Sequence, residues 1–281
     1  MQSIATLAPR RIARLRTWRQ QLGQTMSPTA WALFVLWVGF MIAMPHIVSM
    51  GAEMTLTVSL SVSVLLQGAV VLAILWPHWG AAKTVRALAI VAVLSWGMEA
   101  IGASTGFPFG SYDYTARLQP QLFHVPLLIP VAWWMMLGPS WAVAQVLASR
   151  RGLLVFALFS GLAITAWDLF LDPQMVAWQL WVWETPGGYF GIPWVNYAGW
   201  LLTGVLITLV VRPAQLPVLP LIMVYVTTWL LESIGLAFFF GLPGPAAVGF
   251  VGMGVFVWAV VRRLMRSQAD AEIASASPRR G

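Results

Sequence analysis

The sequence has 281 residues, of which 59% are hydrophobic and only 9% charged, and its formal charge is +7 at pH 7. Because soluble domains carry about 25% charged residues, this composition excludes a protein whose surface faces water. The positive charge does not indicate nucleic-acid binding, since Lys and Arg are confined to the N-terminal arm, short loops and the C-terminal tail. The absence of cysteine excludes disulfides, thiolate metal sites and a cysteine nucleophile.

Apolar runs of membrane-spanning length follow one another along nearly the whole chain. A transmembrane helix needs about 20 mostly apolar residues, and the runs occupy residues 30–50, 55–76, 85–103, 125–147, 152–171, 193–211, 218–240 and 245–261. We therefore expect an all-α, polytopic transmembrane helical bundle of about eight spans. Residues 1–29 would form a basic cytoplasmic arm, residues 30–261 the transmembrane catalytic domain and residues 262–281 a basic, disordered tail.

The basic residues predict the orientation of this bundle. Cytoplasmic loops of membrane proteins are enriched in Lys and Arg. With eight spans and both termini in the cytoplasm, fifteen of the sixteen Lys and Arg residues lie inside, and only Arg117 lies outside. A seven-span arrangement would spoil this separation. We therefore predict an integral, multi-pass protein of the cell (cytoplasmic) membrane, with aromatic-rich loops on its outer side.

The acidic residues gather on the outer side, and four of them lie within or at the ends of apolar spans: Glu99, Asp168, Asp172 and Glu232. An ionisable group at such depth is costly unless it is paired, neutral or facing a wet cavity, so each is a functional candidate. The alternative for each is a neutral acid that hydrogen-bonds to neighbouring helices.

Asp168 and Asp172 stand four residues apart near the outer end of the fifth span, so both project from one helix face. Pro173 is expected to end this helix. Two carboxyl groups placed in this way can share a proton or bind a divalent cation.

A weak internal repeat relates the third and seventh spans. WGMEAIG at residues 96–102 matches WLLESIG at residues 229–235. Both spans run from inside to outside, so a parallel repeat would place Glu99 and Glu232 at equivalent depth, facing one another across a central cavity.

Two long outer loops, residues 104–124 and 173–196, are dense in aromatic residues, Gly and Pro. Such rings suit an interfacial belt or a lid over an apolar ligand. For the tryptophans as a group the belt is favoured, and Trp178, Trp181 and Trp183 are expected on a helix that lies flat at the interface.

The outer face offers acids, amides, aromatic rings and one arginine, but no Gly-rich phosphate loop, HExxH, GxSxG or histidine cluster. This inventory suits proton transfer to an apolar molecule. A buried carboxylic acid can stay protonated near neutral pH and act as a general acid. Aromatic faces and a second, ionised carboxylate can stabilise a developing carbocation.

Several motifs follow one another in the chain: EAIGASTGFPFGSYDY at 99–114, DLFLDPQM at 168–175, WVW at 181–183, GYFGIP at 188–193 and NYAGW at 196–200. Together they closely resemble the CruF-type carotenoid hydratases, and the resemblance covers residues 30–260. It implies a cofactor-independent enzyme that adds water across the terminal C1=C2 double bond of an acyclic carotenoid end, leaving a tertiary alcohol. The implied partners are a lycopene-, γ-carotene- or bacterioruberin-precursor-type carotenoid, water and the lipid bilayer, without nucleic acid or metal. The oligomeric state stays open.

The resemblance assigns no catalytic roles, so these follow from chemistry. We expect Asp168 or Asp172 to donate the proton, with Glu99 and Glu232 orienting water or balancing the cation. Asn196 would hold the water. The substrate-binding candidates, several of them from the outer loops, are Tyr112, Asp113, Tyr114, Phe107, Phe109, Trp181, Trp183, Tyr189 and Asn196. Of these, Asp113 could instead pair with Arg117.

Three other functions fit parts of the pattern. A carotenoid end-group cyclase begins with the same olefin protonation, but an internal double bond captures its cation. An intramembrane prenyltransferase of the UbiA type uses DxxxD motifs to hold a magnesium diphosphate, which should bring several basic residues to a face that offers only Arg117. A proton-coupled transporter could use the buried acids, but the inner half offers no polar path.

Overall fold

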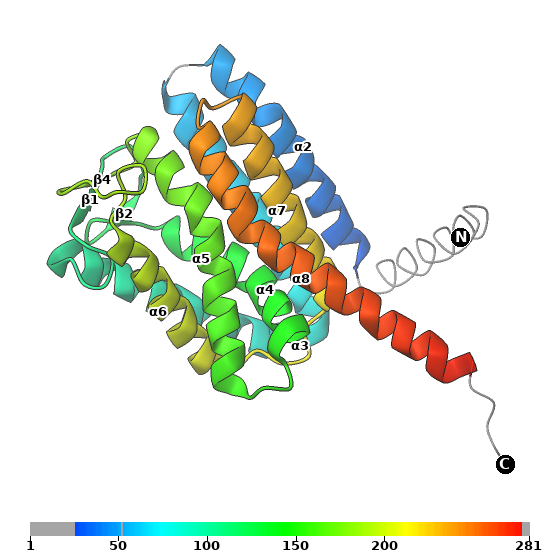
Figure 1. Cartoon of the computed structure of the whole chain (residues 1–281). Helices are drawn as coiled ribbons and strands as arrows, with labels where there is room; N and C mark the ends of the chain where they lie inside the picture. Colours follow the sequence, from blue (N-terminus) through cyan, green and yellow to red (C-terminus); the bar gives the residue numbers. More distant parts are fainter. Residues whose placement is uncertain (1–25, 52, 277–281) are drawn as a thin grey trace.

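The structure, a computed structural model, describes residues 26–51 and 53–276. Most of the predicted basic arm, residues 1–25, therefore lies outside the described residues, as do residues 277–281. The described chain forms seven helices: α2 (Pro28–Met50), α3 (Glu53–Thr105), α4 (Ile129–Ala148), α5 (Leu153–Ala177), α6 (Trp194–Val211), α7 (Val218–Phe238) and α8 (Pro243–Ala276). Each is long and apolar enough to cross a membrane, which confirms the predicted all-α, multi-pass bundle (Figure 1).

Helix α3 consists of two spans. A straight helix of its 53 residues would be about 80 Å long, far longer than the bilayer core of about 30 Å. Its backbone leaves the helical conformation at Gly80 (φ 72°, ψ 168°). The neighbouring indoles of Trp133 and Trp134 donate to Glu99 (3.3 Å) and to the Gly68 carbonyl (3.2 Å), respectively. Residues 68 and 99 therefore lie near one another, so α3 folds back at Gly80 and the bundle has eight spanning segments.

Helix α5 does not end at Pro173, as the sequence analysis expected, but continues to Ala177. Proline lacks the amide that would bond to the carbonyl four residues earlier, which is that of Leu169. The Tyr189 hydroxyl donates to this carbonyl instead, at 2.9 Å. Because the lost hydrogen bond is replaced from the following loop, the helix passes through the proline.

Helix α8 runs beyond membrane-spanning length to Ala276. Residues 262–276 are thus helical, although the sequence analysis expected a disordered tail from residue 262. Seven of its fifteen residues are Ala or Arg, which favour a helix.

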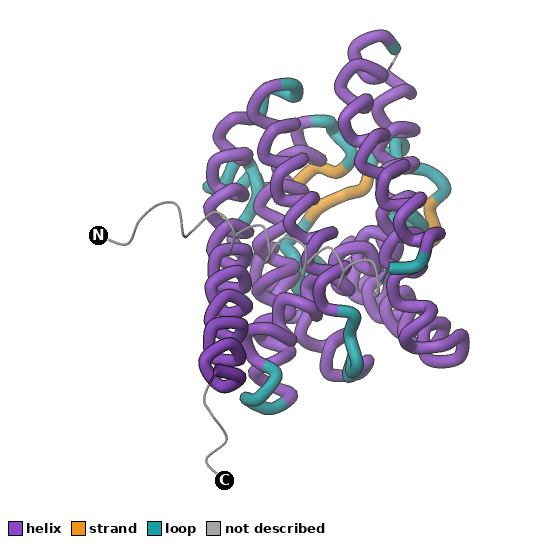
Figure 2. The backbone as a smooth tube through the Cα atoms, turned by 90° about the vertical axis from the view of Figure 1, so that its right-hand side faces the viewer, coloured by secondary structure: helices purple, strands orange, loops and turns teal. Residues whose placement is uncertain are grey.

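Four short strands lie between the helix ends. Strand β1 (Tyr112–Tyr114) pairs antiparallel with β4 (Trp181–Trp183), and β2 (Gln121–Leu122) pairs with β3 (Val125–Pro126). The expected flat helix over Trp178, Trp181 and Trp183 was wrong. Aromatic and β-branched residues favour a strand, and the alternation of a strand turns both β4 tryptophans to its buried face, each only 5% exposed. Figure 2 shows the strands as short orange segments between the helices, and in Figure 1 the labels of β1, β2 and β4 lie together on one side of the molecule.

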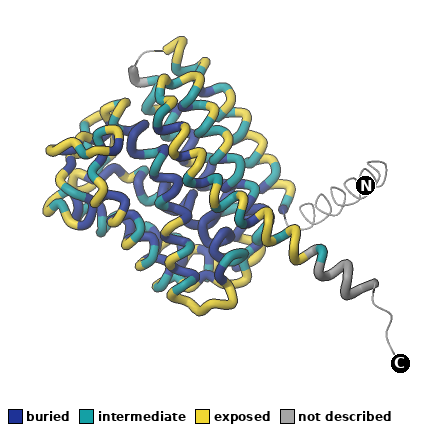
Figure 3. Tube along the Cα trace, in the orientation of Figure 1, coloured by how far each residue is buried: buried dark blue, intermediate teal, exposed yellow. Residues whose placement is uncertain are grey.

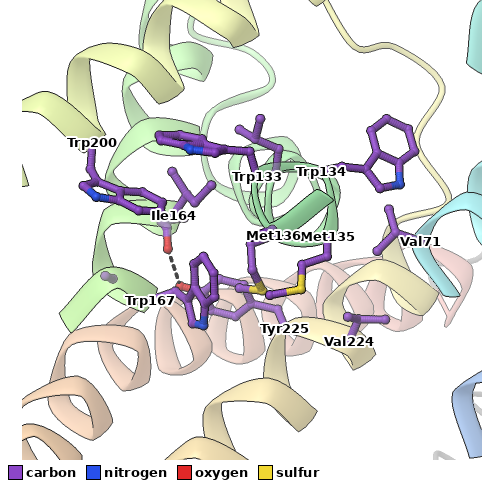
Figure 4. Close-up of a cluster of buried hydrophobic side chains, with 14 of the residues drawn as sticks. Val71, Trp133, Trp134, Met135, Met136, Ile164, Trp167, Trp200, Val224 and Tyr225 are labelled. Carbon is purple, nitrogen blue, oxygen red and sulfur yellow. Dashed lines mark hydrogen bonds between the residues drawn. The ribbon is translucent and has the colours of Figure 1, made fainter. Parts of the chain in front are cut away.

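Helix α4 forms the centre of the bundle. Its spanning window is 78% buried, against 17% for α2, which lies at the edge (Figure 3). The side chains of Trp133, Trp134, Met135 and Met136 radiate from α4 towards neighbouring helices, as Figure 4 shows. The interior of the bundle is therefore built from large, rigid indoles and flexible thioethers, which together fill irregular space.

The charged residues divide between the two ends of the bundle. Helix α4 begins just after β3 and ends just before Arg150 and Arg151, so these arginines lie one helix length away from the strands. In Figure 1 the α4–α5 turn (green, bottom) and the last part of α8 (red) lie away from the strands at the left. This division agrees with the predicted separation of basic and acidic sides.

Candidate active site

A cavity of about 60 Å³ lies among the helices beside strands β1 and β4, large enough for several water-sized groups. Three of the four predicted catalytic carboxyl groups line it, those of Glu99, Asp172 and Glu232. The fourth, on Asp168, is fully buried one helical turn below Asp172. The structure thus brings together acids from α3, α5 and α7.

Asp168 and Asp172 form a pair of buried carboxyl groups one helical turn apart on α5. The amide nitrogen of Asn196, at the start of α6, donates to both of them, to Oδ2 of Asp168 at 3.0 Å and to Oδ2 of Asp172. The indole of Trp181 donates to Oδ1 of Asp172 at 3.1 Å. Two buried carboxyl groups held on one amide nitrogen cannot both ionise readily, because like charges repel. The pair is therefore arranged to share a proton, with Asp172 on the cavity side.

The role expected for Asn196, holding the water, is not the role that its amide nitrogen has here. This nitrogen is committed to the two aspartates, although the residue also lines the cavity. Because α6 begins at Trp194, directly after Pro193, Asn196 lies in the first turn of a rigid helix. Its contacts make it the group that holds the two carboxyls together.

Glu99, near the end of α3, accepts three hydrogen bonds. The Tyr112 hydroxyl donates to Oε2, the Tyr114 hydroxyl donates to the same oxygen at 2.8 Å, and the Trp133 indole donates to Oε1 at 3.3 Å. Burial raises the pKa of Tyr112 and Tyr114 well above the ordinary value, and the negative charge of Glu99 raises it further. Both phenols therefore remain protonated donors, an arrangement that suits an ionised Glu99.

The strand geometry of β1 explains why two tyrosines reach one carboxylate. Residues two apart on a strand point to the same side, so Tyr112 and Tyr114 both face Glu99, and Asp113 between them is exposed. Tyr112 lies opposite Trp183 in the ladder, and Tyr114 lies opposite Trp181. The pairing of β1 with β4 thus connects the Glu99 group to the aspartate group.

Glu232 is held more loosely. Among the described residues its hydrogen-bond partner is the amide of Gln174, at 3.5 Å, the upper limit of a hydrogen bond. Glu99 and Glu232 line one cavity, as the internal repeat predicts, but their surroundings differ. The tryptophans that precede them in the repeat also pack differently, Trp96 against Phe123 and Trp229 in a stack on Phe250.

Indole rings form much of the cavity wall. Trp133 and Trp200 stack with ring centres 4.2 Å apart, and the edge of Trp167 meets Trp200 at 5.9 Å. With Trp181 and Trp183, five tryptophans line the cavity, so the interfacial belt favoured by the sequence analysis does not account for these rings. Such a wall is apolar yet attracts a cation through its ring faces.

The structure separates the predicted substrate-binding residues into two groups. Six line the cavity: Phe109, Tyr112, Tyr114, Trp181, Trp183 and Asn196. The other three do not: Phe107 is 63% exposed, Asp113 is exposed on the far side of β1, and Tyr189 bonds to the Leu169 carbonyl.

The sequence analysis missed other residues that line the cavity, among them Gln67, Trp133, Trp167, Gln174 and Trp200. For two of them a signal was available. Gln67 is an amide inside an apolar span, which is costly unless it has a partner, and here it donates to Thr228 at 3.1 Å. Gln174 belongs to the same motif as the two aspartates.

Comparison with known proteins assigns the chain to a family. Residues 59–256 match the family described as carotenoid biosynthesis protein. A segment of 121 residues is 39% identical to the bisanhydrobacterioruberin hydratase of Haloarcula japonica, and the match covers 42% of this chain and 41% of that relative. No solved structure matches the chain. Because the family match extends over most of the chain and includes all four predicted catalytic acids, the protein belongs to the carotenoid biosynthesis protein family.

Proposed function

We propose that this protein is a carotenoid hydratase of the cell membrane, a hydro-lyase-type enzyme that needs no cofactor. It adds water across the terminal C1=C2 double bond of an acyclic carotenoid end of the lycopene, γ-carotene or bacterioruberin-precursor type. The observation that carries the proposal is the pair of Asp168 and Asp172, joined by the Asn196 amide so that they can share a proton beside a cavity with a wall of indole rings. The name of the Haloarcula japonica relative, a hydratase, supports the same class of reaction.

The first step is protonation of the olefin. Asp172, the member of the pair that faces the cavity, gives its proton to C2, and the π electrons form the new C–H bond. The positive charge then lies on C1, a tertiary carbon. Asp168 lies behind Asp172 and accepts a hydrogen bond from the same Asn196 amide, so an ionised Asp168 favours a protonated Asp172, whose carboxyl group faces the cavity.

The second step is stabilisation of the cation. Trp133 and Trp200 present stacked indoles at the cavity, and ring faces attract cations. Glu99, with three donors already in place, supplies a fixed negative charge. Because these groups are oriented before the charge develops, they need little reorganisation during the reaction.

The last step is capture by water. A water molecule attacks C1 with an oxygen lone pair, forms the C–O bond and releases one proton, which restores the aspartate pair. The sum is one carotenoid end plus one water giving a tertiary alcohol, with no oxidant or reductant. No Lys or Arg is among the described residues that line the cavity, which counts against the binding of a diphosphate in this site.

The direct test is expression in a bacterium that accumulates lycopene, followed by chromatography of the pigments with mass detection. We expect a product heavier by one water that carries a tertiary hydroxyl. An isomer of unchanged mass would identify a cyclase instead. No change with lycopene, γ-carotene or bacterioruberin precursors would contradict the proposal.

Paired variants connect the activity to the site. Asp168→Asn and Asp172→Asn should each abolish product formation, while the amount of membrane-inserted protein stays unchanged. Asp113→Asn is the matched control, because Asp113 is an exposed acid on the far side of β1, and it should retain activity. Full activity in both Asp168→Asn and Asp172→Asn would overturn the assignment of these residues.

A further inference from the structure

A second hollow lies at the basic end of the bundle, one helix length from the active-site cavity. It has a volume of about 1250 Å³ and is lined by five arginines: Arg150 and Arg151 from the α4–α5 turn, and Arg262, Arg263 and Arg266 from α8. Among the described residues that line it there is no Asp or Glu. Two segments far apart in the sequence thus converge on one strongly positive concave surface, which favours an anion.

An apolar groove of about 630 Å³ adjoins this hollow and shares Trp258, Arg262 and Arg266 with it. The groove follows one stripe of α8 from Gly254 through Val257 and Val261 to the arginines. At a rise of about 1.5 Å per residue, that stripe is about 18 Å long, close to the length of a fatty acyl chain. The groove is thus an apolar extension of the positive hollow.

Two local features shape this surface. Gly254 carries no side chain, so the ring of Trp229 packs close to its backbone; a Cβ at this position would lie 3.3 Å from the ring. At the other end, the Arg262 guanidinium lies over the ring of Trp258, 5.0 Å from its centre. A Trp beside an Arg is typical of the membrane–water interface, where headgroups lie.

We propose that this surface binds an anionic phospholipid, with the phosphodiester in the arginine hollow and one acyl chain in the groove along α8. The groove argues for a lipid and against a free phosphate, since only a lipid needs apolar surface next to the positive charge. The described part of the lining has no acidic residue, which argues for an anionic headgroup, because a choline or ethanolamine group would meet no carboxylate there. The site shares no residue with the active-site cavity and does not depend on the proposed function.

The test is native mass spectrometry of the purified, detergent-solubilised full-length protein. Phosphatidylglycerol and phosphatidylcholine with identical acyl chains are titrated separately, and inorganic phosphate is added as a competitor. We expect one phosphatidylglycerol to bind with at least about tenfold higher affinity than phosphatidylcholine. Equal affinity for the two lipids would overturn the proposal. Displacement of phosphatidylglycerol by equimolar phosphate would show a free-anion site and would also overturn it.

Substitutions in the hollow and in the groove test whether the lipid binds at this surface. Near a membrane each basic residue contributes about fivefold to the affinity for anionic lipid, so the double variant Arg262→Gln/Arg266→Gln should bind about 25-fold more weakly. Val261→Trp, which fills the groove and keeps the arginines, should also weaken phosphatidylglycerol binding. The matched control is Arg212→Gln, because Arg212 is exposed at the end of α6 and lines neither the hollow nor the groove. An equal loss in the control would show diffuse attraction and no site, whereas Asp172→Asn should bind the lipid normally.

Discussion

The hydroxyl of Tyr189 donates a hydrogen bond of 2.9 Å to the main-chain carbonyl of Leu169. Without it, this carbonyl would have no partner, because residue 173 is a proline and has no amide to offer. The bond therefore lets α5 continue regularly past Asp172 to Ala177. Burial also raises the pKa of Tyr189, so its phenol stays a donor. The position of a cavity carboxyl thus depends on a tyrosine that does not touch the cavity.

Removing this hydroxyl should destabilise the protein. In Tyr189→Phe the Leu169 carbonyl loses its partner, so we expect the free energy of unfolding to fall by about 1–3 kcal/mol. Thermal unfolding in detergent measures the change. The matched control is Tyr197→Phe, because the buried hydroxyl of Tyr197 has no hydrogen-bond partner among the described residues, and its removal should cost little. Equal losses in the two variants would contradict this account.

The sequence predicted the spans well because hydropathy reports directly on the bilayer. The eight apolar runs correspond to α2, the two halves of α3, and α4 to α8, and the gathering of acids predicted a common site. The expectation of a helix over Trp181 and Trp183 failed, because the three residues of β4 are a strand only through pairing with β1, a distant segment. The prediction that the helix ends at Pro173 failed for the same reason. The Tyr189 hydroxyl that replaces the lost helix hydrogen bond comes from the next loop.

The amide of Asn196 should matter for the rate more than for substrate binding. It holds Asp168 and Asp172 together, so Asn196→Leu leaves the two carboxyl groups without their common donor. Misplacement of a catalytic group by about 1 Å costs about 100-fold in rate, and we expect kcat to fall by this factor with KM little changed. Initial rates in membranes at several carotenoid concentrations measure both constants. A normal kcat would show that the aspartates need no such support.

The two tyrosines of β1 predict how stability depends on pH. The pKa of Tyr112 and Tyr114 is raised above the ordinary value, so the folded protein holds these protons more tightly than the unfolded chain does. Their contribution to stability is therefore fully present below the unfolded pKa of about 10 and is lost as the pH rises above it towards the folded pKa. The melting temperature of the wild type should fall above this pH. The variant Tyr112→Phe/Tyr114→Phe should show a shallower fall, and parallel curves would contradict the prediction.

Two glycines fix the position of Phe109 in the cavity wall. A Cβ at Gly199 would lie 2.6 Å from Cδ1 of Phe109 and 2.8 Å from the Pro108 carbonyl oxygen, and a Cβ at Gly102 would lie 2.7 Å from Cδ2 of Phe109. We expect Gly199→Ala to cost about 1–3 kcal/mol by overpacking and to lower the hydration rate by moving this ring. At Gly97 a Cβ meets nothing within 4 Å. Gly97→Ala should therefore be neutral or stabilising, and the two melting temperatures test the difference.

The two glutamates of the cavity should differ in their importance. Among the described residues, Glu99 accepts hydrogen bonds from three donors, whereas Glu232 has one partner, at 3.5 Å. A charge fixed by several donors stabilises a cation most effectively, because it needs no reorganisation when the cation forms. Glu99→Gln removes this charge and keeps the shape, so the hydration rate should fall about 100- to 1,000-fold, by analogy with the loss of one preorganised electrostatic group. Glu232→Gln should retain the rate within about tenfold of the wild type, on the same electrostatic scale. Product formation in membranes with matched protein amounts decides the matter, and an equal loss in both variants would assign the balancing charge to Glu232 as well.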